Sequence, residues 1–379
     1  MKKRHSSIPS PSRAASRAPA PQKILVAMSG GVDSSLTAAL LVEAGHQVVG
    51  ATLRTFCYSS GPAHARSCCG LEGIEDARAV ARSLGIPHTV YDVEEEFTRD
   101  VVDDFVREYA RGRTPNPCVR CNSFTKFRDL LHRARELGAD GIATGHYVRR
   151  GEDAEGRPAL FRGRDAAKDQ AYFLWGLPRA SLPHLHFPLG ELTKKEVRER
   201  ARALGLDTAH KPESQEICFV PGGDYRDLLK KRLDGEHPAF RPGNIVTRKG
   251  EMVGTHQGYA RFTVGQRKGL PGGFPEAMFV LEIRPETREV VVGTARELRC
   301  REIVLAELNW LSPEPEEGEE VRIQIRHRAP ARPAVVQERK AHTLRLRLLQ
   351  EQPAVTPGQS GVLFRKDRML GGGRIREGR

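Results

Sequence analysis

The sequence predicts the α/β fold class: a doubly wound parallel sheet followed by a small mixed domain and a C-terminal β-barrel. Three patterns along the chain predict this order. Apolar runs alternate with helical periods up to about residue 216, glycine and proline interrupt the chain repeatedly after it, and apolar and basic residues alternate from residue 294 onward. The first pattern is typical of parallel strands joined by helices, and the last is typical of half-buried antiparallel strands.

The first region, residues 23–216, supplies the elements of the sheet and of the helices that cover it. Four apolar segments predict buried strands at 24–28, 48–53, 88–91 and 141–144. Apolar residues three or four positions apart predict amphipathic helices over 76–84, 95–109 and 123–137. Because an open sheet of this kind binds its ligand at the carboxyl ends of the strands, we expect the site there.

The rest of the chain predicts two smaller domains. Residues 217–293 contain one helical segment near 224–231 among closely spaced glycines and prolines, which favours a small mixed domain. Residues 294–379 contain alternating stretches at 321–326 and 344–348, which predict the antiparallel strands of a small barrel. The arginines on one face of these strands either bind phosphates or simply face solvent.

Charge and cysteine content restrict the partner and the compartment. A net charge of +13 favours a polyanion, with nucleic acid ahead of a membrane surface, although a generally basic solvated surface remains an alternative. Residues 1–22 are basic without any acidic residue and predict a disordered tail, or a start codon placed too early, in preference to a transit peptide. No apolar run approaches the roughly 20 residues of a membrane-spanning helix. Seven cysteines without a secretion signal indicate thiols with individual roles, so we expect a cytoplasmic protein.

A glycine-serine loop between the first strand and the first helix is the most informative local feature. Residues 29–35 read Ser-Gly-Gly-Val-Asp-Ser-Ser. Two glycines permit a tight turn, and the helix N-terminus together with Ser29, Ser34 and Ser35 offers donors to an anion of pyrophosphate size. No lysine follows the glycines as it does in the P-loop of kinases and GTPases, which argues against that chemistry. Asp33 either orients Mg²⁺ or a serine, or caps the helix.

Three cysteines have sequence surroundings that favour reactivity. Cys118 and Cys121 form a Cys-x-x-Cys motif just before a predicted helix, where backbone amides and Arg120 favour the thiolate. Cys218 lies in a polar segment at the end of the first domain. These thiols are therefore candidates for nucleophiles or metal ligands. Cys57, Cys68, Cys69 and Cys300 are assigned no role.

Eight motifs in a fixed order resemble those of the bacterial tRNA-specific 2-thiouridylases, which belong to the N-type ATP pyrophosphatase class. The resemblance spans nearly everything after residue 22. The motifs are SGGVDS (29–34), TPNPCxxCN (114–122), TGHY (144–147), KDQxYFL (168–174), SQEICF (214–219), TVGQRKGL (263–270), TPGQS (356–360) and LGGG (370–373).

The resemblance implies an adenine nucleotide alpha hydrolase-like sheet and a defined reaction. ATP with Mg²⁺ adenylates O2 of the wobble uridine in tRNA, sulfur attacks C2, and AMP leaves. Cys218 carries a persulfide received from a sulfur-relay protein or a cysteine desulfurase. Cys121 is the nucleophile that frees the sulfur or closes a disulfide with Cys218. The oligomeric state and the tRNAs that serve as substrates do not follow from the sequence.

The same resemblance implies two sets of binding residues. The ATP set is Ala27, Met28, Ser29, Gly30, Gly31, Val32, Asp33, Ser34, Leu53 and Gly145. The tRNA set is Asn116, Pro117, Cys118, His146, Lys168, Asp169, Gln170, Arg326, His327 and Gln359. Two members have a competing explanation, because Leu53 fits plain core packing and His146 fits a buried, hydrogen-bonded imidazole.

One position departs from the pattern of the family. Well-known members have aspartate where this chain has Cys118. Cys118, Cys121 and Cys218 are therefore an alternative ligand set for a 4Fe-4S cluster with one open iron, whereas a structural zinc ion wants four ligands. No metal site is certain.

Two other functions remain as alternatives. One is an amidating synthetase of the same ATP pyrophosphatase class, which would need a source of ammonia and no cysteines. The other is a non-catalytic RNA-binding protein with a degenerate loop, although Ser29, Asp33 and Ser34 are intact.

Overall fold

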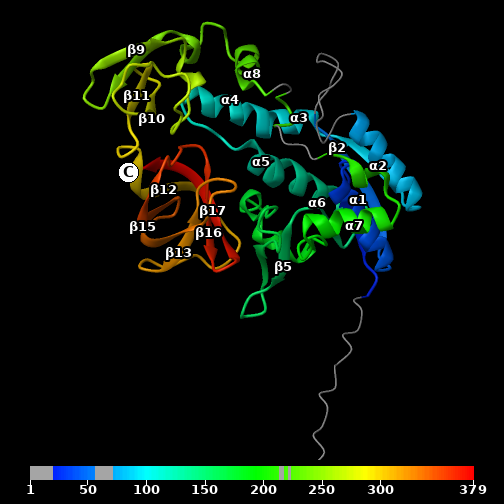
Figure 1. The fold of residues 1–379 in the computed structure, drawn as a ribbon. Helices are drawn as coiled ribbons and strands as arrows, with labels where there is room; N and C mark the ends of the chain where they lie inside the picture. Colours follow the sequence, from blue (N-terminus) through cyan, green and yellow to red (C-terminus); the bar gives the residue numbers. More distant parts are fainter. Residues whose placement is uncertain (1–19, 56–70, 213–216, 221–222) are drawn as a thin grey trace, which may run out of the picture.

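The structure is a computed structural model that describes residues 20–55, 71–212, 217–220 and 223–379. Three regions lie side by side: an α/β region, a small β-rich region drawn in yellow-green, and an orange-red barrel (Figure 1). Of the predicted tail, only residues 20–22 are among the described residues. Cys57, Cys68 and Cys69 lie outside the described residues. No helix in the described ranges is long and apolar enough to cross a membrane.

A five-stranded parallel sheet in the order β3-β2-β1-β4-β7 is the base of the α/β region. Its strands are β1 (Lys23–Ala27), β2 (Gln47–Arg54), β3 (His88–Asp92), β4 (Gly141–Ala143) and β7 (Leu185–His186). The four predicted strands are confirmed, and the two-residue β7 carries too short a pattern to be predicted. The strand order reverses beside β1, so the loops after β1 and β4 leave the sheet at one crevice, where such sheets bind ligands.

Helices cover both faces of this sheet, as the doubly wound prediction requires. Alternate residues of β1 point to opposite faces, so Ile24 and Val26 enter one core cluster and Leu25 enters another. The first cluster includes residues of α1 (Val32–Glu43), α2 (Leu71–Ser83) and α7 (Lys194–Ala203), and the second includes residues of α6 (Phe127–Glu136).

Two long helical stretches each contain a π-helical turn. The first runs through α3 (Glu94–Phe97), a π turn at Thr98–Val102 and α4 (Asp103–Ala110). The second runs through α5 (Pro117–Arg120), a π turn at Cys121–Lys126 and α6. Turns of this kind often mark functional sites, because they insert a residue that packing alone does not need.

The second helical stretch begins before residue 123, where the sequence pattern predicts its start. The helix begins at Pro117, since the Asn116 side chain accepts a hydrogen bond from the Cys118 N–H and proline suits the first turn. Cys118 and Cys121 therefore lie within the first turns of the helix, and the prediction that they precede it is wrong.

The yellow-green region combines one helix with a small sheet. Helix α8 (Tyr225–Arg232) begins after the capping Asp224, as the pattern near 224–231 predicts. The sheet has the order β10-β11-β8-β9. Its strands are β8 (Gly243–Thr247), β9 (Met252–His256), β10 (Met278–Arg284) and β11 (Glu289–Thr294).

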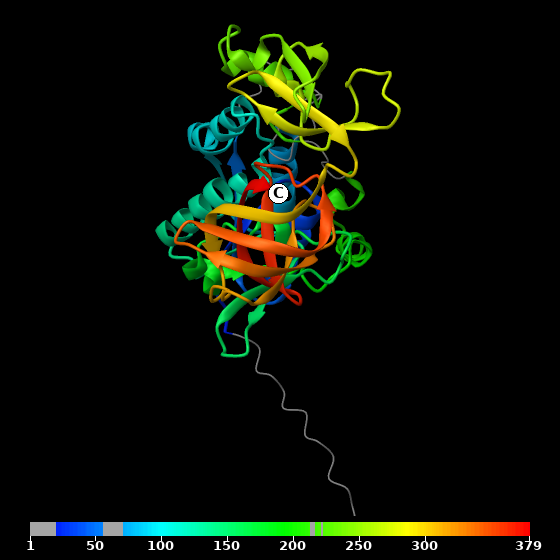
Figure 2. The ribbon, with the colours of Figure 1, turned by 90° about the vertical axis from the view of Figure 1, so that its left-hand side faces the viewer.

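The C-terminal region closes into a six-stranded antiparallel barrel, because β12 pairs with both β15 and β17. The strands are β12 (Arg299–Trp310), β13 (Glu320–Gln324), β14 (Arg332–Arg339), β15 (Thr343–Pro353), β16 (Ser360–Arg365) and β17 (Arg368–Gly378). Figure 2 shows these strands wrapping around one another. The barrel prediction is confirmed, and its apolar residues at alternate positions form one interior cluster.

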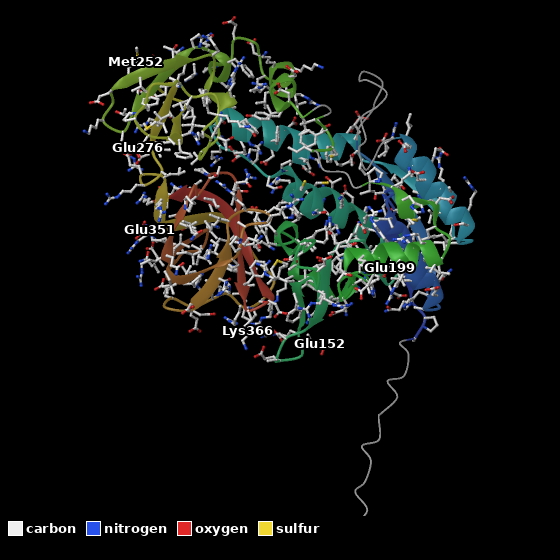
Figure 3. All side chains as sticks on the ribbon, viewed as in Figure 1. Glu152, Glu199, Met252, Glu276, Glu351 and Lys366 are labelled. Atoms are coloured by element: carbon white, nitrogen blue, oxygen red, sulfur yellow. The ribbon has the colours of Figure 1, made fainter. Side chains whose placement is uncertain are left out.

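The α/β region reaches the barrel through a hairpin that the sequence did not predict. The hairpin is formed by β5 (Val148–Glu152) and β6 (Pro158–Arg162), and β6 pairs with β17 where Phe161 meets Arg368. Figure 3 places Glu152 of this hairpin near Lys366 of the barrel, on the same side of the molecule. The regions therefore share hydrogen bonds as well as core residues.

Candidate active site

The loop between β1 and α1 has the shape of an anion cradle. Gly30 has a φ of +74°, and a Cβ there would lie 2.3 Å from the carbonyl oxygen of Gly73, so glycine is required. Gly31 is the N-cap of α1 and offers no side-chain hydrogen bond to the first turn. The N–H groups of that turn are thus donors available to an anion, and the helix dipole favours a negative charge there.

Two of the three serines shape this loop. Ser34 Oγ accepts a hydrogen bond from the Ser29 N–H at 3.1 Å and donates to the Gly31 carbonyl at 3.0 Å. Ser35 Oγ donates to the same carbonyl at 3.0 Å. Ser34 and Ser35 therefore hold the backbone, and the Ser29 hydroxyl lies 3.4 Å from Ser34 Oγ, so donation from these hydroxyls to phosphate stays a prediction.

Gly145 brings the loop after β4 against the start of α1. A Cβ on Gly145 would lie 2.8 Å from the carbonyl carbon of Asp33 and 2.9 Å from the amide nitrogen of Ser34. The two loops of the crevice are therefore in backbone contact, which fits the expected close approach at Gly145. The flanking Met28 and Val32 are buried, and Ala27 is partly buried.

Asp33 is paired with a lysine that the sequence analysis missed. Lys194 Nζ lies 2.7 Å and 2.8 Å from the two carboxylate oxygens of Asp33, and the Tyr147 hydroxyl donates to Oδ1 at 2.7 Å. The only local signal is the capping box of Thr193 and Glu196, which predicts a helix start but not what it faces. Asp33 is not the N-cap residue.

Leu53 lies at the end of β2 with 8% of its surface exposed, inside the core cluster that contains Leu25 and α6. This placement favours its competing explanation as a core residue. Contact with adenine stays a prediction.

The thiol region begins at the N-terminus of α5. Cys118 is exposed and Cys121 is half-buried. Arg120 donates to the Asp100 carbonyl at 3.1 Å, and its guanidinium lies 4.1 Å from the centre of the Phe124 ring. Arg120 is therefore engaged with these groups, so the helix N-terminus is the better reason to expect thiolate character at Cys118.

Cys218 packs against the same hydrophobic core cluster as Cys121. The next residue, Phe219, is buried between the rings of Phe97 and Phe105, with centroid distances of 5.7 Å and 5.3 Å. Cys121 and Cys218 are both partly buried and packed against the core cluster that contains these three rings. Thiols from two distant motifs thus pack against one core cluster.

The chain segment that leads to Cys218 is also tied to the glycine loop. Lys211 forms an ion pair with Asp76 on α2 and another with Glu72 at 3.0 Å. A Cβ on Gly30 would lie 2.9 Å from the Asp76 Cβ, so this ion pair adjoins the anion cradle.

The three thiols do not form a metal site as they lie. Among the described residues, no three His, Cys, Asp or Glu side chains are grouped so that they could hold a metal ion. Cys118, Cys121 and Cys218 all belong to this described set.

Three regions of the fold meet at the loop that leads to Cys118. The Thr114 N–H donates to the Pro357 carbonyl at 2.9 Å, and its hydroxyl donates to Thr263 Oγ1 at 3.1 Å. Gln359 Nε2 donates to the Thr114 carbonyl at 2.8 Å. Three of the sequence motifs therefore converge on this loop, and the amide of Gln359 supports it from the barrel.

Several residues of the predicted tRNA set form ion pairs or hydrogen bonds within the protein, as Gln359 does. Asp169 is paired with Arg162 at 2.6 Å, and Gln170 accepts from the Tyr147 N–H at 2.9 Å. Arg326 donates to Thr356 Oγ1 at 2.9 Å and to the Ala354 carbonyl at 2.5 Å.

The remaining members of that set differ in exposure. The His327 ring packs 4.4 Å from Phe173, Lys168 and Asn116 are half-buried, and Pro117 is buried. Cys118 is thus the one fully exposed member of the set. None of these contacts with tRNA is tested by the structure.

His146 lies among aromatic rings. Its ring centre is 5.7 Å from that of Phe127 and 6.4 Å from that of Phe187, and Nδ1 is hydrogen-bonded to Thr144 Oγ1 at 2.7 Å. Burial, with a smaller effect of Lys126, lowers the pKa of His146 to about 3. The imidazole is therefore neutral at pH 7 and offers no charge to a phosphate, which favours its competing explanation.

Exposed cations that were not singled out lie on the yellow-green region. Arg261, Arg267 and Lys268 are exposed, and no ion pair joins them to another described residue. Arg261 and Gln266 line an open pocket of about 430 Å³ beside the start of α8. The TVGQRKGL motif was the available signal, but its basic residues could not be placed on a surface from the sequence.

Comparisons with known proteins cover almost the whole chain. Residues 22–222 match the tRNA methyl transferase HUP domain, residues 229–294 the tRNA methyl transferase PRC-barrel domain, and residues 300–375 the aminomethyltransferase beta-barrel domain. The tRNA-specific 2-thiouridylase MnmA of Carboxydothermus hydrogenoformans is 48% identical over 93% of this chain and 97% of its own. That of Magnetococcus marinus is 46% identical over 94% and 99%. A solved 4-thiouridine synthetase with RNA and bound ATP aligns with a TM-score of 0.35 and 18% identity, over 56% of this chain and 50% of that chain.

Proposed function

Because this chain belongs to the tRNA-specific 2-thiouridylase family, we propose that it is a tRNA-uridine 2-sulfurtransferase that uses ATP to replace O2 of the wobble uridine by sulfur. The observation that carries the proposal is the packing of Cys121 and Cys218 against one core cluster. That cluster lies in a chain whose first loop is shaped for pyrophosphate.

The first step activates the carbonyl. Uracil O2 attacks the α-phosphorus of ATP, the bond from that phosphorus to the bridging oxygen breaks, pyrophosphate leaves with the electron pair, and N3 loses its proton. The first-turn amides of α1 and Ser29 hold the phosphates. Mg²⁺ would enter with ATP and help to neutralise the phosphate charge, and Asp33 is the carboxylate of the loop that could hold it. AMP is then a good leaving group on C2.

The second step delivers sulfur. Cys218 receives a persulfide from a sulfur-relay protein or a cysteine desulfurase. The Cys121 thiolate attacks the inner sulfur, which forms a Cys121–Cys218 disulfide and releases hydrosulfide. Hydrosulfide attacks C2, and AMP leaves with the former uracil oxygen. An external thiol then reduces the disulfide. This route requires the two Cα atoms to approach to about 5.5 Å.

Binding roles follow the family pattern at matching positions. We assign ATP binding to residues 27–34, Leu53 and Gly145, within a catalytic domain of residues 23–216. We assign the target base to Asn116, Pro117 and Cys118. The half-buried Lys168 and the exposed cations of residues 261–268 are better phosphate ligands than Arg326, which already donates to Ala354 and Thr356.

A 4Fe-4S route would perform the same reaction with different sulfur chemistry. The spacing of Cys118 and Cys121 and the unusual Cys118 support this alternative, although no three His, Cys, Asp or Glu side chains of the described residues are grouped so that they could hold a metal ion. Anaerobic purification with iron and sulfide analysis separates the routes. A colourless, iron-free protein that is active with a persulfide donor eliminates the cluster.

The proposed function is tested by incubating the protein with tRNA, ATP and a persulfide donor, followed by mass spectrometry of the tRNA nucleosides. We expect 2-thiouridine at the wobble position, with AMP and pyrophosphate as products. Asp33→Ala should abolish adenylation and leave tRNA affinity nearly intact, whereas Glu43→Ala, at the exposed end of the same helix, should behave as wild type. ADP, or no nucleotide turnover with tRNA, would defeat the proposal.

A further inference from the structure

Lys194 is a largely buried lysine whose ammonium lies beside the anion cradle. Its side chain is 12% exposed, and Nζ contacts both carboxylate oxygens of Asp33 in the first turn of α1. The neighbouring Lys195 shows the usual alternative for a lysine on this helix. Its side chain is 85% exposed and lies 3.9 Å from Glu199, which Figure 3 labels on the outside of α7.

The backbone fixes the position of Lys194 before any ligand binds. It is the first residue of α7, whose capping box joins Thr193 and Glu196. Its own N–H donates to Asp165 Oδ2 at 2.9 Å. Both sides of the lysine are therefore anchored, so the direction of its side chain is largely set by the helix start.

The electrostatics of this placement are unfavourable without an anion. Lys194 begins α7, and its ammonium meets the first turn of α1, so it faces the positive ends of two helices. A cation is disfavoured at either end. The Asp33 carboxylate offsets this repulsion between the ammonium and the helix ends in the structure. A phosphate group bound to the first turn of α1 would offset the same repulsion equally well.

We propose that Lys194 is the phosphate-binding lysine of this ATP site, supplied from α7 in place of the lysine that the loop itself lacks. The inference rests on the proposed function and adds a catalytic residue to it. As O2 attacks the α-phosphorus and the bond to the bridging oxygen breaks, the electron pair passes to pyrophosphate. The Lys194 ammonium keeps its protons and neutralises that charge, while Asp33 turns toward the magnesium ion of the substrate.

The test compares Lys194→Met with Lys195→Met, which removes a charge from the exposed neighbour. Titration with inorganic pyrophosphate and Mg²⁺ should show binding at least about tenfold weaker in Lys194→Met, because a charge-assisted contact is lost. Binding of adenosine, which carries no phosphate, should change less than about twofold. Formation of AMP with tRNA should fall about 100-fold, as for other groups that stabilise developing charge. Lys195→Met should match wild type in each assay.

A merely structural role predicts a different pattern. If Lys194 only holds α7 against α1, Lys194→Met should lower the melting temperature and weaken adenosine and pyrophosphate equally, which would overturn the inference. Equal activity of the two variants would overturn it as well. Lys194→Arg keeps the charge, so it should recover pyrophosphate binding. If the wild-type protein forms no AMP with tRNA, the proposed function fails, and pyrophosphate binding alone decides the role of Lys194.

Discussion

Arg374 of β17 lies 2.9 Å from Glu108 of α4, and both side chains are buried. The same guanidinium is 3.0 Å from Asp104, so one arginine of the barrel pairs with two buried carboxylates of the α/β region. The preceding glycines pack closely inside the barrel. A Cβ on Gly373 would lie 2.6 Å from the Ala306 carbonyl oxygen, which explains the LGGG motif as a packing requirement.

Replacing Arg374 should separate the barrel from the α/β region. Arg374→Met leaves Asp104 and Glu108 buried with less compensation, so the free energy of unfolding should fall by about 3 kcal/mol. Urea denaturation measures this. Arg376→Met on the same strand changes an exposed arginine and should have little effect. Equal midpoints for the two variants would contradict a stabilising role for the cluster.

The thiol assignments predict separate losses of sulfur transfer and adenylation. Cys218→Ser should stop formation of 2-thiouridine yet allow adenylated tRNA to accumulate, because the loop remains intact. Cys121→Ser should retain the persulfide on Cys218 without transferring it. Burial raises the pKa of the Cys300 thiol, so Cys300→Ser is a suitable control and should remain active. Nucleoside and peptide mass spectrometry report the products, and continued thiolation by Cys218→Ser would remove its assigned role.

The partly buried imidazole of His146, whose pKa burial lowers, predicts a loss of stability in acid. Its pKa is about 3 in the folded protein and about 6.5 in an unfolded chain, so between these values only the unfolded state binds the proton. Stability should therefore fall as the pH drops below about 6.5, by at most about 1.4 kcal/mol per pH unit from this group. Urea unfolding from pH 7 to pH 5 should show a shallower dependence for His146→Gln than for the exposed-site variant His132→Gln. Parallel profiles would contradict the burial of the ring.

The exposed cations of the yellow-green region predict the salt dependence of tRNA binding. Each phosphate contact contributes roughly 1 to the slope of log K against log salt concentration. The double variant Arg267→Gln/Lys268→Gln should therefore lower that slope by roughly 2. Arg326→Gln should instead lower the melting temperature and leave the slope unchanged, since its guanidinium holds Ala354 and Thr356. A reduced slope for Arg326→Gln would restore the contact that the sequence implied.

Local patterns predicted the parts of the fold that depend on neighbouring residues. The strands of the sheet, the glycine loop and the alternating strands of the barrel all follow from periodicity and turn residues. The predicted helix started too late, at residue 123. The helical pattern before that residue is weak, so Asn116 was not identified as the N-cap.

The contacts that complete the site join residues far apart in the chain. Lys194 meets Asp33, Gln359 supports Thr114, and Arg374 meets Glu108 only after the regions pack together. No periodicity records such contacts. Motif residues that resembled tRNA ligands, such as Asp169, are bonded within the fold, because a motif does not distinguish a ligand contact from an internal support.

The central claim is that the glycine-serine loop adenylates a uridine oxygen that sulfur then displaces. It is tested most directly with a tRNA whose wobble uridine carries a heavy-oxygen label at O2, incubated with ATP and a persulfide donor. The account predicts that mass spectrometry finds the label in the phosphate of AMP, in the same amount as the 2-thiouridine formed. Unlabelled AMP, with the label retained in tRNA or released to water, would contradict it.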